Sequence, residues 1–104
     1  MIAIGVIIAR MTTTALCRCR VADYDHFRRG YDYAVTVTPG VRSFRVWRGQ
    51  DDPNLVVIEE TFDTREEAVA AWTSEETKAA MAADGIDMSS LWIEYFDEAG
   101  AGTL

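Results

Sequence analysis

The chain has 104 residues, of which 49% are hydrophobic and 11% aromatic, a composition that suits one globular domain and excludes a disordered chain. A formal net charge of −7 argues against nucleic acid as a partner, because phosphate binding needs a basic face. Residues 1–50 carry eight Arg against three Asp (+5), and residues 51–104 carry Arg65 and Lys78 against fourteen acids (−12). The two halves should therefore attract each other, within a subunit or across a dimer; the alternative is that they form solvated faces of opposite sign.

The first ten residues form a separate feature. Residues 2–9 are a short apolar run followed by Arg10, too short to cross a bilayer and without a preceding basic segment, so we expect no membrane association. Met11 then begins a stretch that reads like a natural protein start. We interpret residues 1–12 as an N-terminal extension ahead of a domain over residues 13–98. The alternative is an added edge strand that covers a sheet or swaps between subunits.

The segment Thr13–Val21 alternates between two faces, which predicts a half-buried strand. Cys17 and Cys19 lie on its apolar face, and Arg18 and Arg20 on the other. Two cysteines at this spacing in a strand rarely form a disulfide, and no second cysteine pair completes a metal site. We therefore expect buried free thiols, no metal, and a reducing cytoplasmic location.

A helix is predicted from Tyr24, with Asp23 as its N-cap and an end near residues 35–38, before a Pro-Gly pair. Its apolar stripe comprises Phe27, Tyr31 and Ala34. His26 in the first turn is the only histidine, a residue type that often serves as a general base, which makes it a candidate for that role at the mouth of a pocket. The plainer interpretation is an exposed residue that pairs with a neighbouring carboxylate.

Two strands are predicted over residues 41–48 and 55–62, joined by a turn that contains Asp52-Pro53-Asn54. The second of them begins with a nearly apolar run and should be central. Its Glu59 and Glu60 should form cross-strand ion pairs with Arg18 and Arg20. Alternatively, one of these two arginines could clamp an anionic substrate.

The remaining residues predict a helix that breaks once, a last strand and a tail. Thr64 begins a capping box, Ser74 resembles a second cap inside the helical stretch, and Gly85 is a suitable helix end. The buried face of this helix should comprise Ala68, Val69 and Trp72. A strand is expected over residues 90–96, and residues 99–104 should form a flexible tail.

The element order β-α-β-β-α-β predicts an α+β, ferredoxin-like fold with an antiparallel four-stranded sheet of order 4-1-3-2 and both helical segments on one face. The other face carries Leu16 and Trp47 and is too apolar to remain in water. We therefore expect a homodimer in which two sheets pack face to face as a dimeric α/β barrel.

Four segments together resemble the antibiotic biosynthesis monooxygenase family of the dimeric α/β barrel superfamily: residues 21–32 (VADYDHFRRGYD), 51–54 (DDPN), 58–68 (IEETFDTREEA) and 75–87 (EETKAAMAADGID). The resemblance covers residues 13–98. It implies oxygenation without a metal, flavin or haem cofactor, in a cleft between the helices and the sheet. It also implies a small aromatic substrate, phenolic or polycyclic, that is deprotonated and then reduces O₂ directly.

The candidate site residues follow from this resemblance and from the distribution of aromatic and basic side chains. We expect His26, Tyr31 and Trp72 to be catalytic, and Tyr24, Arg18, Trp47 and Trp92 to bind the substrate, with Tyr33 and Tyr95 as further aromatic candidates. The plainer interpretation of the three tryptophans is packing in the core or at a dimer interface. Related haem degraders use an Asn on the first strand and a His ten residues after the helical Trp; this chain offers neither, since Ala82 follows Trp72 at that distance.

The leading hypothesis is therefore a cofactor-independent monooxygenase acting on an aromatic or polyketide-like metabolite. The alternative is a non-catalytic homodimeric ligand-binding or structural module of the same fold, because no base-and-partner pair is evident. A third hypothesis is a non-oxidative cyclase or isomerase. An open apolar pocket with an inward Tyr, His or Arg would favour an enzyme, and a fully packed space would favour the module.

Overall fold

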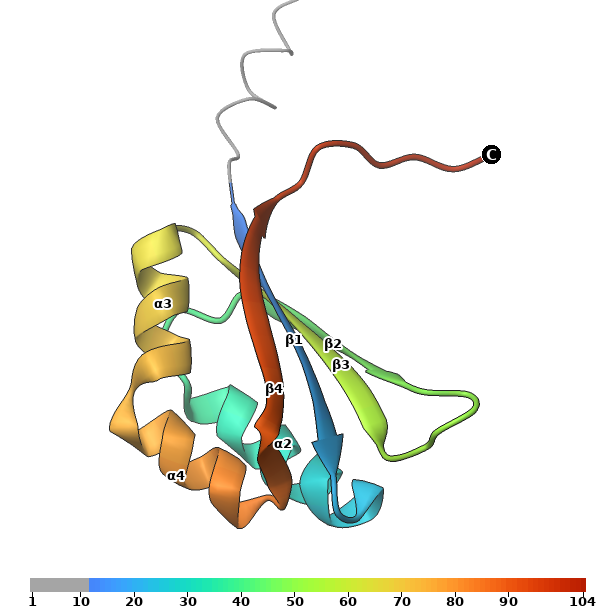
Figure 1. Ribbon diagram of the computed structural model, residues 1–104. Helices are drawn as coiled ribbons and strands as arrows, with labels where there is room; N and C mark the ends of the chain where they lie inside the picture. Colours follow the sequence, from blue (N-terminus) through green and yellow to red (C-terminus); the bar gives the residue numbers. More distant parts are fainter. Residues whose placement is uncertain (1–11) are drawn as a thin grey trace, which may run out of the picture.

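The computed structural model describes residues 12–104, so the N-terminal extension expected over residues 1–12 lies almost entirely outside the described residues. In chain order the elements are β1 (Thr13–Val21), α2 (Tyr24–Val37), β2 (Ser43–Arg48), β3 (Leu55–Phe62), α3 (Arg65–Thr73), α4 (Glu75–Ala83) and β4 (Ile86–Asp97). All neighbouring strands are antiparallel, in the order β2-β3-β1-β4. This is the predicted order 4-1-3-2 read from the opposite edge. The three helices cover one side of the sheet (Figure 1), which confirms the α+β ferredoxin-like fold.

The core lies between the helices and the sheet because β1 and β3 alternate with period two. The inward side chains of the two central strands include Cys17, Cys19, Val56, Ile58 and Phe62, all almost fully buried. Both cysteines are free, as expected. Phe27 and Tyr31 of α2 pack on this surface with their rings 5.7 Å apart.

Side-chain caps set the helix boundaries, as predicted. Asp23 accepts a hydrogen bond from the backbone N–H of Asp25, and Thr64 accepts one from that of Glu67. Ser74 ends α3 and caps α4, so the predicted break in the helical stretch is confirmed. Gly85 has a φ of +79°, a conformation that favours glycine and directs the chain from α4 into β4.

Three strand boundaries differ from the prediction. β2 begins at Ser43 rather than at residue 41, and β4 runs from Ile86 to Asp97 rather than over residues 90–96. After Ile86, the residues up to Ser90 have weak strand propensity, but Ile86 and Asp87 pair with Val21 and Arg20 of β1 across a register shift. Pairing with a central strand therefore extends β4 beyond its local sequence preference.

The predicted ion pairs between the β1 arginines and the β3 glutamates are wrong. Arg18 lies opposite Val57, and Glu60 points to the other face of the sheet. Arg20 instead forms an ion pair with Asp52 of the β2–β3 turn. This pair and Arg42–Asp63, at 2.5 Å, join the basic first half of the chain to its acidic second half.

The sheet face opposite the helices remains apolar and open in the single chain. Trp47, Trp92 and Phe96 are 52%, 42% and 43% exposed. The pairings of Trp47 with Val57 and of Arg18 with Trp92 place these side chains on the same face as Leu16. We call this surface, made by Leu16, Trp47, Val57, Trp92 and Phe96, the outer face. None of the helices in residues 12–104 is long and apolar enough to cross a membrane.

Candidate active site

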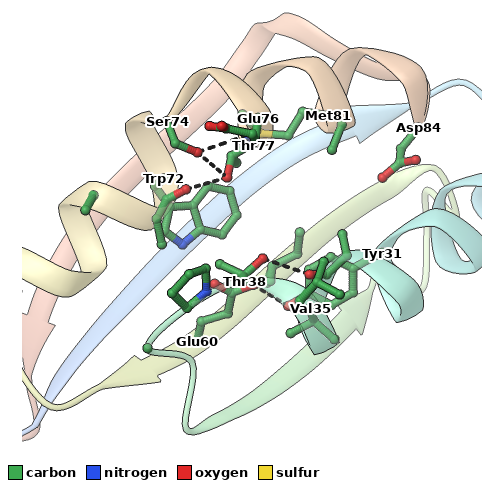
Figure 2. A pocket seen from close by; sticks show the side chains of 18 of the residues that line it. Tyr31, Val35, Thr38, Glu60, Trp72, Ser74, Glu76, Thr77, Met81 and Asp84 are labelled. Atoms are coloured by element: carbon green, nitrogen blue, oxygen red, sulfur yellow. Dashed lines mark hydrogen bonds between the residues drawn. The ribbon is translucent and has the colours of Figure 1, made fainter.

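A pocket of about 590 Å³ lies between α2, α3–α4 and the inner surface of the sheet (Figure 2). Its walls are mostly apolar and include Phe27, Val35, Ile58, Ala71 and Met81. The volume falls in the range of sites that enclose a small organic molecule. The space between the helices and the sheet is therefore not fully packed.

Glu60 is the most unusual side chain in this pocket. It lies on β3 in register with the inward residues Ile58 and Phe62, and it is only 4% exposed. The Tyr31 hydroxyl donates a hydrogen bond of 2.6 Å to Oε2 of Glu60. Burial raises the pKa of the Glu60 carboxyl above its usual value, while the hydrogen bond from Tyr31 and the nearby N–H of Trp72 act in the opposite direction. Burial and the neighbouring Glu60 charge raise the pKa of Tyr31.

The Trp72 indole provides a hydrogen-bond donor that lacks a regular acceptor. Trp72 lies on α3 and is 6% exposed, and its buried Nε1 makes no hydrogen bond of regular geometry. The N–H points from the helical wall toward the side of the pocket that holds Glu60 (Figure 2), close enough to lower the pKa of that carboxyl. Buried indole N–H groups usually have a partner, so this donor is available to a ligand.

The hydroxyl groups in the pocket wall are already used as donors. Thr38 donates to the carbonyl of Ala34, at 2.7 Å, and Thr77 donates to that of Ala71, at 2.5 Å. Ser74 donates to the Thr77 hydroxyl at 2.9 Å. These hydrogen bonds stabilise the helix ends around the pocket and leave the hydroxyl oxygens to act only as acceptors.

Three more carboxylates line the pocket, Glu67 on α3 and Glu76 and Asp84 on or directly after α4. Burial raises the pKa of Asp84, and the nearby His26 partly offsets this effect. Asp84 approaches α2 at Gly30, where the Cβ of any larger residue would collide with the Asp84 carboxylate. Glycine at this position therefore leaves room for that carboxylate at the edge of the pocket.

The structure brings together two of the three expected catalytic residues, Tyr31 and Trp72. His26 is exposed and does not line the pocket. Its Nε2 lies 2.9 Å from the carbonyl oxygen of Ala83, at the C-terminal end of α4, where a histidine can satisfy a free helix carbonyl.

The four expected substrate-binding residues lie outside this pocket. The Tyr24 ring lies under the Arg48 guanidinium at 4.0 Å, and its hydroxyl accepts a hydrogen bond from Arg28. Arg18, Trp47 and Trp92 project from the side of the sheet that bears the outer face. Trp47 donates a hydrogen bond to Glu59 there.

Sequence reasoning missed Glu60 as a site residue, although a signal was present. Val56, Ile58 and Phe62 are apolar and share one face of β3, and Glu60 occupies the same parity. A lone carboxylate among inward positions is more informative than the same residue on an outward face. The interpretation of Glu59 and Glu60 as an equivalent surface pair hid this difference.

Among residues 12–104, no group of three or more His, Cys, Asp or Glu side chains is arranged to hold a metal ion. The chemistry that the pocket offers is proton transfer by Glu60, with Tyr31 as its partner, and hydrogen bonding by the Trp72 indole to an acceptor on a ligand. An apolar enclosure strengthens both interactions because little water competes for them.

Comparison with known proteins places this geometry in a recognised fold. No protein-family model matches the sequence, and no curated protein matches it. Among solved structures, SnoaB, a cofactor-independent oxygenase from Streptomyces nogalater, aligns with a TM-score of 0.64 at 15% identity over 90% of this chain and 97% of that one. A Caulobacter crescentus protein, provisionally named an antibiotic biosynthesis monooxygenase, aligns with a TM-score of 0.68 at 16% identity over 88% and 92%.

A Nitrosomonas europaea protein with the same provisional name aligns with a TM-score of 0.65 at 17% identity, over 85% of this chain and 90% of that one. These structures align over nearly their whole lengths, so the likeness concerns the complete domain. The chain therefore has the fold of the antibiotic biosynthesis monooxygenases, as the sequence resemblance predicts.

Proposed function

We propose that this protein is a cofactor-independent monooxygenase that acts on an aromatic or polyketide-like metabolite in the pocket between helices and sheet. The observation that carries the proposal is the buried carboxyl of Glu60, hydrogen-bonded by Tyr31 in the wall of an apolar cavity. The name of SnoaB as a cofactor-independent oxygenase supports the same reaction class.

Glu60 acts as the general base in this mechanism. Its carboxylate removes a proton from an acidic O–H or C–H group of the ring system, and burial makes it a stronger base than an exposed glutamate. Tyr31 holds the carboxylate in position through its hydrogen bond. The Trp72 N–H donates to the carbonyl or phenolate oxygen on which negative charge develops.

The deprotonated substrate then reduces O₂ directly. One electron passes from the substrate anion to O₂, and the two radicals combine to form a peroxide anion at the former C–H carbon. This anion takes the proton back from Glu60, which restores the base, and the hydroperoxide then loses water to leave a carbonyl. One oxygen atom is retained in the product and the other leaves as water, so a CH₂ group and O₂ become C=O and H₂O. The protein contributes deprotonation, orientation and a dry environment.

The open cavity supports an enzyme over a non-catalytic module of the same fold. No pair of a base and its hydrogen-bond partner was evident from the sequence, and Glu60 with Tyr31 is a candidate for such a pair. A cyclase or isomerase would use the same base without oxygen. Product formation under nitrogen would indicate that alternative.

The direct test is O₂ uptake with a panel of anthrone-type and quinol-type substrates. We expect turnover by the wild type and a loss of about 100-fold or more in Glu60→Gln, the usual contribution of a general base. Glu59→Gln is the matched control, because Glu59 is the adjacent residue on the opposite face of β3. Absence of turnover across the panel, or full activity in Glu60→Gln, would contradict the proposal.

We also propose that the protein is a homodimer that buries the outer face. Trp47, Trp92 and Phe96 are each more than 40% exposed in the single chain and lie on one sheet surface. A contiguous apolar patch of aromatic side chains is typical of an interface. The charged side chains beside it have both signs, Arg18 and Arg45 against Glu59 and Glu94, so two copies could pair them in an antiparallel arrangement.

A further inference from the structure

The polar groups of the pocket are strongly unbalanced between donors and acceptors. The part of its lining that residues 12–104 provide contains four carboxylates, those of Glu60, Glu67, Glu76 and Asp84, and no Lys, Arg or His. The lining hydroxyl groups of Thr38, Ser74, Thr77 and Tyr31 already donate to protein acceptors. The unpartnered Trp72 N–H is thus the side-chain donor that remains for a ligand.

The charged groups at the rim of the pocket are also mostly negative and lack ion-pair partners among residues 12–104. Glu76 and Asp84 form no ion pair among those found in residues 12–104, although Asp84 lies near His26. They are separated by eight residues, about 12 Å along the helix direction, so they occupy the two ends of the same wall. Partial burial of Asp84 reduces the screening of its charge by water.

We propose that the pocket selects an aromatic ligand that carries a protonated amine and rejects ligands that carry a carboxylate. The apolar body lies among Phe27, Ile58 and Met81, one acceptor atom of the ring system meets the Trp72 N–H, and the ammonium group reaches Glu76 or Asp84 at the rim. An anionic group would meet acceptors of like charge and a single donor, which is unfavourable. This selectivity rests on the site of the proposed function but not on its reaction.

Three probes with the same ring and nearly the same length test the selectivity. They are 2-(1-naphthyl)ethylamine, 2-(1-naphthyl)ethanol and 1-naphthylacetate, which are cationic, neutral and anionic at neutral pH. We expect calorimetry at low salt to give the amine an affinity about tenfold above the alcohol, with the acetate about tenfold below it. Raising the ionic strength to about 0.5 M should reduce both differences.

The location of binding is read from the indole N–H resonances in ¹⁵N-correlated NMR spectra. Trp72→Phe identifies the Trp72 signal. We expect this signal to move on addition of the amine, while the signals of Trp47 and Trp92 on the outer face remain in place. Movement of the Trp47 or Trp92 signal alone would overturn the proposal.

The variants Glu76→Gln and Asp84→Asn remove one rim charge each and should lower the ratio of amine to acetate affinity by about threefold to tenfold. Glu75→Gln is the matched control. It removes the same charge from the first turn of the same helix, but Glu75 is outside the pocket and its side chain is 89% exposed. The control should leave the ratio unchanged.

The proposal is overturned if the acetate binds as tightly as the amine, if no probe binds, or if the Glu75 control lowers the ratio as much as the rim variants. These readouts are independent of oxygen. Selective amine binding without O₂ uptake would therefore support the selectivity and contradict the proposed oxygenase activity. O₂-dependent turnover of an acidic substrate, with no preference for the amine, would support the oxygenase activity and contradict the selectivity.

Discussion

Glu60 occupies a position where the fold favours a hydrophobic side chain and where a proposed reaction needs a base. It lies among Val56, Ile58 and Phe62 on the inward face of β3, and its hydrogen bond comes from a neutral hydroxyl rather than a cation. A buried carboxylate without a cationic partner lowers the stability of the folded state. Function and stability should therefore respond in opposite directions to its removal.

Glu60→Gln should stabilise the protein by about 1 kcal/mol at neutral pH, a common gain when an unfavourable functional group is removed. The folded state raises the pKa of Glu60 above the ordinary 4.5, so it binds this proton more tightly than the unfolded chain does. Wild-type stability from this group is therefore present below pH 4.5 and is lost as the pH rises through the folded pKa.

Urea unfolding at several pH values measures this effect. The difference in unfolding free energy between Glu60→Gln and the wild type should grow with pH over that window and then level off. Parallel stability curves for the two proteins would contradict the assignment of a raised pKa to Glu60.

Tyr31→Phe should lower the free energy of unfolding by about 1 to 3 kcal/mol, because it leaves the buried Glu60 carboxyl without its 2.6 Å hydrogen bond. It should also raise the pKa of Glu60 further, which moves the acid limb of any activity profile to higher pH. Tyr33→Phe on the same helix is the control, since Tyr33 is 70% exposed and should change neither quantity. Equal effects of the two variants on unfolding would show that the hydrogen bond contributes little.

The sequence predicts the aromatic part of the candidate site better than its acid–base part. Tyr31 and Trp72 are recognisable because they lie on the apolar faces of helices that must cover the sheet. His26 was expected there because it is the only histidine, but the direction of its side chain depends on how α2 meets the end of α4, a tertiary contact without a local signal. Glu60 could have been identified from its position in the alternation of β3, because it falls on the inward face with Val56, Ile58 and Phe62.

Helices and strands were predictable wherever a cap or an alternation marked them. The bounds of β1 and β3, the start of α2 and the break at Ser74 all agree with the sequence prediction, because each depends on interactions within a few residues. The start of β4 was missed because its first residues become a strand only through pairing with distant β1. Local sequence patterns therefore could not predict the strand residues that depend on pairing with a distant segment.

The break between α3 and α4 also forms part of the pocket, which separates two effects of cap removal. Ser74→Ala and Thr64→Ala should each reduce stability by about 1 kcal/mol, since each removes the N-cap of one helix. Ser74 lines the pocket whereas Thr64 does not. Only Ser74→Ala should therefore also weaken binding of a naphthyl probe, as measured by calorimetry. An equal loss of affinity in both variants would indicate that general stability, rather than the wall at Ser74, controls binding.

Association of two copies is the prediction that concerns the molecule as a whole. The outer face has no cover from residues 12–104 of its own chain, as its exposed tryptophans show. We expect light scattering at micromolar concentration to give about 23 kDa, twice the chain mass of 11.6 kDa. The double variant Trp47→Glu/Trp92→Glu should give the mass of one chain, because buried like charges oppose association.

Tyr33→Glu is the control for that experiment. It introduces the same charge at an exposed aromatic residue on α2, away from the sheet surface, and should leave the mass unchanged. A wild-type protein that remains a monomer at these concentrations would contradict the face-to-face dimer.

The small side chains along α3 and α4 have a consequence for how such a protein could change over evolution. Ala70, Ala71 and Ala80 form part of the helical wall, so the room available to a ligand is limited there by single methyl groups. A point mutation from Ala to Val at any of them would narrow the chamber without altering the sheet, the caps or Glu60. Lineages that share this scaffold could thus adapt to molecules of different width through single substitutions in the helices, while the proposed base on the sheet stays unchanged.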